Sequence, residues 1–231
     1  VTGVQTCALP ISLVLAAWLT QSQLGGVGVR FTRSVLLELQ RTALPLGFFL
    51  IVLNLYSYID GVMLGVVRGD AETGVYSAAY KVYEGLSYLP SVIASVLTPR
   101  LSALFPVDPA AHRRLAIQGV AGSVGLAVLV GGVSYLLAGP ILVLLFGAPF
   151  LPSAAPFRIL SLGLPLVFAI WVLHATAISV NKEGLLLKAA IVGLVVNLSA
   201  NAYAIPHLGA NGAALATVVG EFISMLVMIA G

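Results

Sequence analysis

The chain has 231 residues, of which 60% are hydrophobic and 8% are charged, and its net charge at pH 7 is +3. Soluble domains carry roughly 25% charged residues, so this composition excludes an ordinary soluble protein. In lipid, only helices and closed barrels satisfy their own backbone polar groups. The apolar runs of this chain are about twenty residues long and do not alternate with a period of two. The sequence therefore predicts an all-α, polytopic membrane helical bundle.

The first eleven residues, VTGVQTCALPI, are unlike the rest of the chain. They resemble the translation of a common sequencing adapter, and they lack the basic region that opens a signal peptide. We expect residues 1–11 to be an artefact, so that Cys7 says nothing about redox compartment. The run EFISMLVMIAG ends at Gly231 without a polar tail, and we expect the chain to be a fragment cut at both ends.

Hydropathy predicts a partial span near 13–20 and six longer spans, at about 43–66, 74–104, 115–138, 154–179, 185–205 and 211–230. The stretch 139–152 is too short to span and is expected to be an interfacial or re-entrant helix. Pro45 suits the first turn of its helix. We expect Pro90, Pro99 and Pro165 to kink or interrupt theirs.

Charge predicts the sidedness of these spans. Three alternate connections carry most of the basic residues, and under the positive-inside rule they are cytoplasmic. The positive net charge follows from this topology and implies no nucleic-acid partner. The eight residues are Arg30, Arg33, Arg41, Arg100, Arg113, Arg114, Lys182 and Lys188.

Two opposite charges lie inside the first two long spans, where hydrocarbon makes them costly. If the turn between these spans is near residue 70, Asp60 and Lys81 lie at the same depth on neighbouring helices. We expect the two to interact. Their role is then either a salt bridge that pins the hairpin or a polar lining on the outer side of a substrate cavity.

The second span also carries a stripe of hydroxyl groups. Tyr76, Tyr80, Glu84 and Tyr88 recur every four residues with Tyr83 beside them, so they share one helix face. Tyrosine near a membrane interface is often part of an aromatic belt. Tyr80, Tyr83 and Glu84 lie deeper than a belt, and such a face would also suit a sugar or an amphiphilic substrate.

Three further polar positions allow two interpretations each, and a pair of asparagines has one expected role. Glu221, near the middle of the last span, is either a protonated group bonded between helices or the site of a coupling proton or sodium ion. Arg158 either snorkels to the interface or binds a phosphate. His174 either makes one helical hydrogen bond or titrates near neutral pH. Asn197 and Asn201, on one face of the fifth span, are expected to hold helices together.

The sequence contains no Walker loop, HExxH or CxxC motif. We therefore expect no enzyme activity of these types, no cofactor and no metal site.

The blocks LPLGFFLIVLNLYSYIDGVMLG, ETGVYSAAYKVYE and VLTPRLSAL resemble the start of the C-terminal lobe of Wzx-like oligosaccharide flippases. LLFGAPFLPSAAPFRILSL and VNLSANAYAIPHLGANGAALATVVGE are similar to later signatures of that family. The pattern IPxxGAxGAAxAT at 205–217 is its most specific part. The five blocks stand in the family's order and cover residues 13–231.

The resemblance implies one lobe of a two-lobed fold, related to the multidrug and toxic compound extruders. Residues 12–20 would end a transmembrane helix, 21–42 would be the cytoplasmic interlobe linker, and 43–231 would be the C-terminal transmembrane lobe. The N-terminal lobe would be missing. Such proteins move an undecaprenyl-pyrophosphate-linked oligosaccharide across the cytoplasmic membrane by alternating access, for surface polysaccharides such as O-antigen.

The resemblance places Asp60 and Glu221 at acidic positions of the family without giving either a transport role. Relatives often line the cavity with several basic residues, whereas this lobe offers only Lys81 and Arg158. We take Asp60, Lys81, Glu84, Tyr80, Tyr83 and Arg158 as substrate-cavity candidates, and Glu221 as the candidate for H⁺ or Na⁺ coupling. The alternative function is a cation-coupled exporter of drugs or metabolites from the same superfamily.

Overall fold

A computed structural model describes residues 33–231, with side chains for Phe48 and for residues 51–231. The expectations for residues 1–11 and 12–20, and for most of the linker, lie outside the described residues. The chain divides into two units, Val1–Ala43 and Leu44–Gly231, and the fold and the site described below belong to the second.

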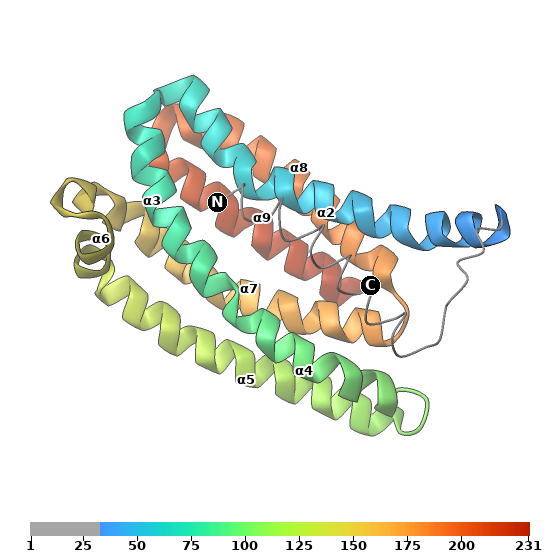
Figure 1. The fold of residues 1–231 in the computed structure, drawn as a ribbon. Helices are drawn as coiled ribbons and strands as arrows, with labels where there is room; N and C mark the ends of the chain where they lie inside the picture. Colours follow the sequence, from blue (N-terminus) through green and yellow to red (C-terminus); the bar gives the residue numbers. More distant parts are fainter. Residues whose placement is uncertain (1–32) are drawn as a thin grey trace, which may run out of the picture. The chain divides into compact units, whose positions relative to one another are not determined.

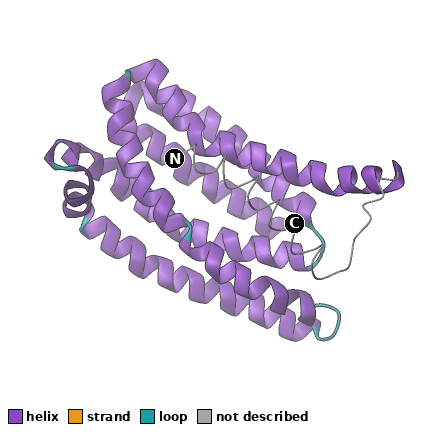
Figure 2. Ribbon diagram, viewed as in Figure 1, coloured by secondary structure: helices purple, strands orange, loops and turns teal. Residues whose placement is uncertain are grey.

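The described residues are helical, joined by short turns, and they contain no strand (Figures 1 and 2). The predicted all-α bundle is therefore confirmed. In chain order the helices are α2 (Arg33–Arg68), α3 (Asp70–Ser87), α4 (Leu89–Leu104), α5 (Pro109–Leu136), α6 (Ala138–Phe146), η1 (Ala148–Ser153), α7 (Ala154–Ser179), α8 (Glu183–Leu208) and α9 (Ala210–Ala230).

Five of the described helical segments are long and apolar enough to cross a membrane, which makes this a multi-pass membrane protein. Four match the predicted spans that begin near 43, 115, 185 and 211, and the fifth runs through η1 and α7. The predicted span 74–104 is the exception, because it forms two helices, α3 and α4, that meet at Tyr88. Pro90 lies in the first turn of α4, where its missing N–H ends the helical bonding of α3.

The other prolines behave differently from Pro90. Pro99 and Pro165 lie inside α4 and α7, and neither interrupts its helix. Pro45 was expected in a first turn, but α2 begins at Arg33, so Pro45 lies in the helix interior. The stretch 139–152 does not span: it forms α6 and the short 3₁₀-helix η1.

Helix α7 is the centre of the bundle and contacts α3, α4, α5 and α9. Its large side chains Phe157, Leu164 and Phe168 are fully buried. Helices α8 and α9 approach closely at glycines: a Cβ on Gly212 would collide with the carbonyl oxygen of Ala204, and one on Gly220 would lie 3.2 Å from the carbonyl oxygen of Gly193. Large apolar side chains cover much of the outer surface, as is suited to lipid.

The turns separate into two ends of the bundle (Figure 1). The α4–α5 turn, which follows Arg100, and the α7–α8 turn, which contains Lys182, lie at one end. The α2–α3 and α8–α9 turns and α6 lie at the other end. This arrangement agrees with the sidedness expected from charge, and the two are called the basic end and the outer end below.

Candidate functional site

Asp60 is at the centre of a buried hydrogen-bond network that joins four helices. Its side chain on α2 is 1% exposed. Its Oδ2 accepts hydrogen bonds from Tyr76 Oη on α3, at 2.8 Å, and from Thr217 Oγ1 on α9, at 2.6 Å. Its Oδ1 accepts one from Asn201 Nδ2 on α8, at 2.5 Å. Each carboxylate oxygen therefore has a donor, which is what a buried carboxylate requires.

The expected pair of Asp60 with Lys81 is not formed. Lys81 Nζ is 2.7 Å from Glu84 Oε2, one turn along its own helix, and it lies 6.0 Å from the centre of the Tyr58 ring. Equal depth along the hairpin, which the sequence suggested, is not sufficient for a contact, because the direction of the side chain decides it. Lys81 is about 140° around α3 from Tyr76, which is the residue that faces Asp60.

The amides expected to hold helices together do so at this network. Asn201 donates to Asp60 across the helix interface, and it also lies 3.1 Å from Asn197 Oδ1 on its own helix. Both asparagines are fully buried. The sequence analysis did not identify Thr217, although it lies at the end of the 205–217 signature. A threonine four residues before Glu221, inside an apolar helix, was the available signal.

Glu221 is bonded to Tyr83. The Tyr83 hydroxyl donates to Glu221 Oε1, and the Glu221 residue is 8% exposed. The second oxygen, Oε2, has no hydrogen-bond partner among the described residues. Gly163 on α7 leaves room for the carboxyl, because a Cβ there would lie 3.0 Å from Oε2. Glu221 therefore has one oxygen available for a proton, a cation or water.

A cavity of about 430 Å³ lies beside this carboxyl. The predicted tyrosine stripe contributes four of its polar and aromatic lining residues, and α2 contributes another four. The rings along the stripe are in contact: the Tyr76 and Tyr80 centroids are 5.7 Å apart, and those of Tyr80 and Tyr83 are 5.9 Å apart. The polar and aromatic lining residues are Asn54, Tyr56, Ser57, Tyr58, Tyr80, Tyr83, Glu84, Ser87, Tyr88, Trp171 and Glu221.

A second cavity, of about 190 Å³, lies on the other side of Glu221. It shares Tyr56, Trp171 and Glu221 with the first and extends to His174 and Ser224. The Trp171 and His174 rings meet edge to face, with centroids 6.2 Å apart. Glu221 is thus at the junction of two cavities, one towards the tyrosine stripe and one towards His174.

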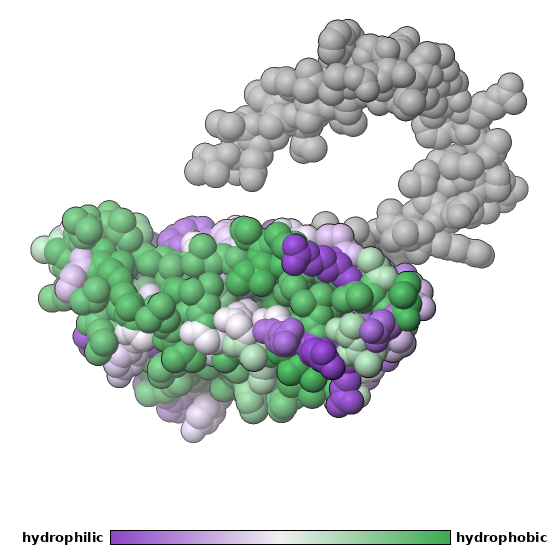
Figure 3. Space-filling view, turned by 90° about the horizontal axis from the view of Figure 1, so that it is seen from below, coloured by the Kyte–Doolittle hydropathy of each residue, from purple (hydrophilic) through white to green (hydrophobic). Residues whose placement is uncertain are grey.

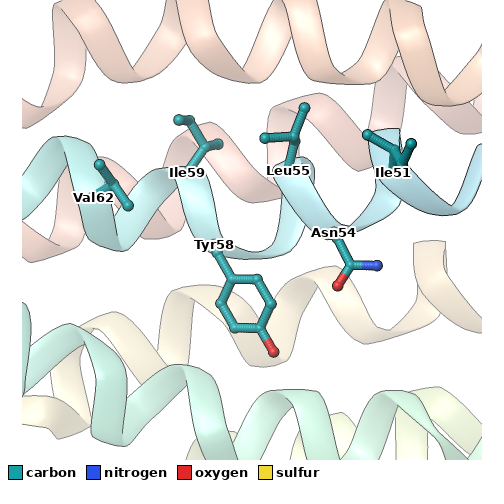
Figure 4. Close-up of a pocket in the computed structure, with 6 residues that line it drawn as sticks. All are labelled: Ile51, Asn54, Leu55, Tyr58, Ile59 and Val62. Carbon is teal, nitrogen blue, oxygen red and sulfur yellow. The ribbon is translucent and has the colours of Figure 1, made fainter. Parts of the chain in front are cut away.

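A groove of about 400 Å³ runs along α2 (Figure 4). Figure 4 shows Asn54 and Tyr58 pointing to one side of the helix, whereas Ile51, Leu55 and Ile59 point to the other. Asn54 and Tyr58 also line the large cavity, so the groove and the cavity share a border.

The structure does not bring all the candidate residues together. Tyr80, Tyr83, Glu84 and Glu221 line the large cavity. Lys81, Asp60 and Arg158 are not among the described residues that line it. Arg158 is exposed, where its Nε donates to the Tyr135 carbonyl oxygen at 3.3 Å and its guanidinium lies over the Tyr135 ring. An exposed guanidinium of this kind is compatible with snorkelling, which stays a prediction.

A clasp at the outer end was not expected from the sequence. Arg68, in the last turn of α2, donates from Nη2 to Pro206 O at 2.8 Å and from Nε to Ile205 O at 3.2 Å. Glu72, in the first turn of α3, accepts the backbone N–H of Ala210 at 3.2 Å. These bonds fasten the α2–α3 turn to the α8–α9 turn, which lies within the 205–217 pattern.

Among the described residues there is no group of three or more His, Cys, Asp or Glu side chains that could hold a metal ion. The fold and the cavity define a class: a helical, multi-pass membrane protein with a largely apolar cavity that carries several polar groups. Residues 1–105 match the family model described as "Polysaccharide biosynthesis protein". No curated protein and no solved structure matches the chain.

Proposed function

We propose that this chain is part of a flippase of the cytoplasmic membrane. Its substrate is an undecaprenyl-pyrophosphate-linked oligosaccharide for surface polysaccharides such as O-antigen, moved to the outer leaflet by alternating access. The match of residues 1–105 to the polysaccharide biosynthesis family carries this proposal. The cavity supports it, because it could hold part of such a substrate.

The cavity suits the sugar part of such a substrate. Tyrosine rings offer flat apolar faces, and their hydroxyl groups both donate and accept hydrogen bonds. Glu84 adds an acceptor on the same wall, and Asn54 lies on the opposite one. Ligand sites of this kind are mostly apolar with a few placed polar groups. Tyr80, Tyr83 and Glu84 are therefore the residues proposed to contact sugar.

The pyrophosphate is proposed to bind outside this cavity. Both carboxylates in the cavity wall, Glu84 and Glu221, would repel it. The nearest cation, Lys81, is already paired with Glu84. A contribution from the N-terminal lobe of the same protein would then complete the substrate site.

Glu221 is proposed to couple transport to a proton or sodium gradient. Glu221 lines both cavities, and its Oε2 is buried without a hydrogen-bond partner among the described residues, so a proton or ion bound to this carboxyl would change the charge at the wall of the substrate cavity. The same observation favours the second candidate function, a cation-coupled exporter of drugs or metabolites from the same superfamily. The two candidates differ in substrate and share this site.

Complementation tests the proposal. The complete gene is expressed in a strain that lacks its own flippase, and surface polysaccharide and cell-bound lipid-linked oligosaccharide are measured. Tyr80→Ala and Glu84→Gln are expected to lower surface polysaccharide and to raise the lipid-linked precursor. Tyr203→Ala is the matched control, because Tyr203 is 73% exposed on α8. No complementation by the wild-type protein, together with raised drug resistance, would select the exporter.

Glu221→Gln separates coupling from substrate binding. The substitution keeps the shape of the side chain and removes its charge. We expect transport to become independent of the ion gradient or to stop, at an unchanged protein level. Transport that keeps its wild-type dependence on the gradient would remove Glu221 from the coupling mechanism.

A further inference from the structure

The α4–α5 turn carries a basic surface that neither the cavity nor the coupling site uses. Arg113 and Arg114 lie in the first turns of α5, and both are exposed. Arg100, also exposed, lies near the end of α4. Figure 3 shows a largely hydrophobic face on which hydrophilic residues gather towards the basic end. Charge and apolar surface therefore meet at this end of the molecule.

The surface is hollowed next to the arginines. A shallow, open cavity of about 440 Å³ lies against one face of α5 and is lined by Ala110, Arg113, Arg114, Ile117 and Gln118. This helix face thus offers two guanidinium groups, one amide and the side chain of Ile117, which is 58% exposed. This combination of planar cationic donors with an adjoining apolar wall suits a phosphate that is attached to something apolar.

The arginines have no carboxylate partner. Within residues 51–231, the structure places Arg100, Arg113 and Arg114 in no ion pair, and the ion pairs there are Arg68–Glu72 and Lys81–Glu84. Asp108 is the acidic residue of this turn, and it accepts the backbone N–H of Ala111 at 2.9 Å as the N-cap of α5. The positive charge is therefore not neutralised by the protein nearby.

Apolar side chains flank the same turn. Val107 at its tip is 81% exposed and Phe105 is 41% exposed. The Phe105 ring rests against His112, with ring centroids 5.4 Å apart, and His112 is in turn bonded to Ser179 at 2.9 Å. The turn is thus held to α7 while its tip is presented outwards, as in a segment that lies in a membrane interface.

We propose that the cavity at Arg113 and Arg114 binds the headgroup phosphate of an anionic phospholipid. The two guanidinium groups hold the phosphate, Gln118 bonds the polar headgroup, and an acyl chain runs along Ile117. Basic pockets at the cytoplasmic side of membrane helices bind anionic lipids in this way. A soluble phosphate or pyrophosphate shares the phosphate chemistry, but it would make no use of the exposed apolar residues. The inference is independent of the proposed transport function.

Lipid-dependent stability tests this site on the complete protein in neutral detergent. The melting temperature is measured with added phosphatidylglycerol, phosphatidylcholine or inorganic pyrophosphate. We expect phosphatidylglycerol to raise the melting temperature and phosphatidylcholine and pyrophosphate to leave it unchanged. We expect the rise to shrink as NaCl increases, because the exposed charges are screened.

Two variants assign the effect to the cavity. The double variant Arg113→Gln/Arg114→Gln should bind phosphatidylglycerol about 30-fold more weakly. This is the loss expected if each arginine contributes the binding free energy that one basic residue gains near an anionic membrane surface. Arg113→Lys/Arg114→Lys keeps the charge and should retain part of the binding, even if the glutamine variant folds poorly. Arg158→Gln is the matched control, because it removes one exposed arginine that lies outside this cavity.

The outcomes distinguish a lipid site in this cavity, a lipid effect elsewhere on the protein, and a site for a soluble phosphate compound. Loss of the shift in the glutamine variant, with the shift intact in Arg158→Gln, supports the lipid site. An equal shift in all variants overturns it, because the lipid would then act elsewhere. A shift with pyrophosphate that competes with phosphatidylglycerol also overturns it, and assigns the cavity to a soluble phosphate compound.

Discussion

At the scale of single residues, Asp60 shows how a charge is tolerated inside this bundle. Three donors on three other helices reach its two oxygens, although the lysine at the same depth points elsewhere. Sequence analysis could identify Asp60 as important and give its depth, because both follow from its place in the span. It could not identify the partners, because Asn201 and Thr217 are 141 and 157 residues away along the chain.

Asp60→Ala is expected to destabilise the protein by roughly 2–4 kcal/mol, because it leaves buried donors without an acceptor. Lys81→Ala is the control. Its partner Glu84 lies on the same helix and the Lys81 side chain is 57% exposed, so its loss should cost less than about 1 kcal/mol. Thermal unfolding of both variants in detergent measures the difference. Equal losses would mean that Lys81 shares in holding Asp60.

Tyr83→Phe tests the bond to Glu221. The substitution removes the donor to Oε1, so the buried carboxyl is left without a hydrogen bond from the described residues, and we expect a loss of roughly 1–3 kcal/mol. Tyr58→Phe, at a residue 56% exposed, should leave the melting temperature nearly unchanged. In a double-mutant cycle, Tyr83→Phe should cost much less in a Glu221→Leu background. Additive losses would contradict the bond.

At the scale of helices, the sequence predicted most of the elements well. The apolar runs located α5, α7, α8 and α9, since span length and hydropathy decide them. The break between α3 and α4 was signalled by Pro90, but its effect on the span count was not foreseen. The outer clasp was missed, because Arg68 and Glu72 look like ordinary turn residues until the α8–α9 turn is folded against them.

The outer clasp leads to a prediction about Gly209. This residue has a φ of 55°, which favours glycine, and a Cβ there would collide with Glu72 Oε2. Gly209→Ala should therefore lower the stability by more than the 1–2 kcal/mol of backbone strain alone. Combining it with Glu72→Ala removes the collision and should recover part of the loss. Unfolding measurements that show no recovery would mean that Glu72 does not approach Gly209.

At the scale of the whole molecule, the two ends differ in charge and in fastening. The basic end carries the α4–α5 turn with its arginines, whereas the outer end is closed by the clasp. The basic residues predicted which turns share one end of the bundle, and the positive-inside rule leads us to expect that this end is cytoplasmic. The cavity itself could not be predicted in this way, because its shape depends on which faces of α2, α3, α7 and α9 meet.

Cysteine labelling measures the polarity directly. In a cysteine-free background of the complete protein, His207→Cys at the outer end should react with a membrane-impermeant thiol reagent in intact cells. Val107→Cys, at a position 81% exposed on the basic end, should react only after the membrane is opened. Labelling of both positions in intact cells would contradict the topology, and the reverse pattern would invert it.

The Asp60 network has a consequence for building hybrid proteins. A chimera joined at the α7–α8 turn would exchange residues 181–231, and with them two of the three donors that Asp60 needs. If the incoming segment has no amide at position 201 and no hydroxyl at position 217, Asp60 loses these two hydrogen bonds and remains buried. A good fit of the apolar surfaces does not compensate for this loss. Hybrids that carry the pair, or that replace Asp60 together with the segment, are the ones expected to assemble.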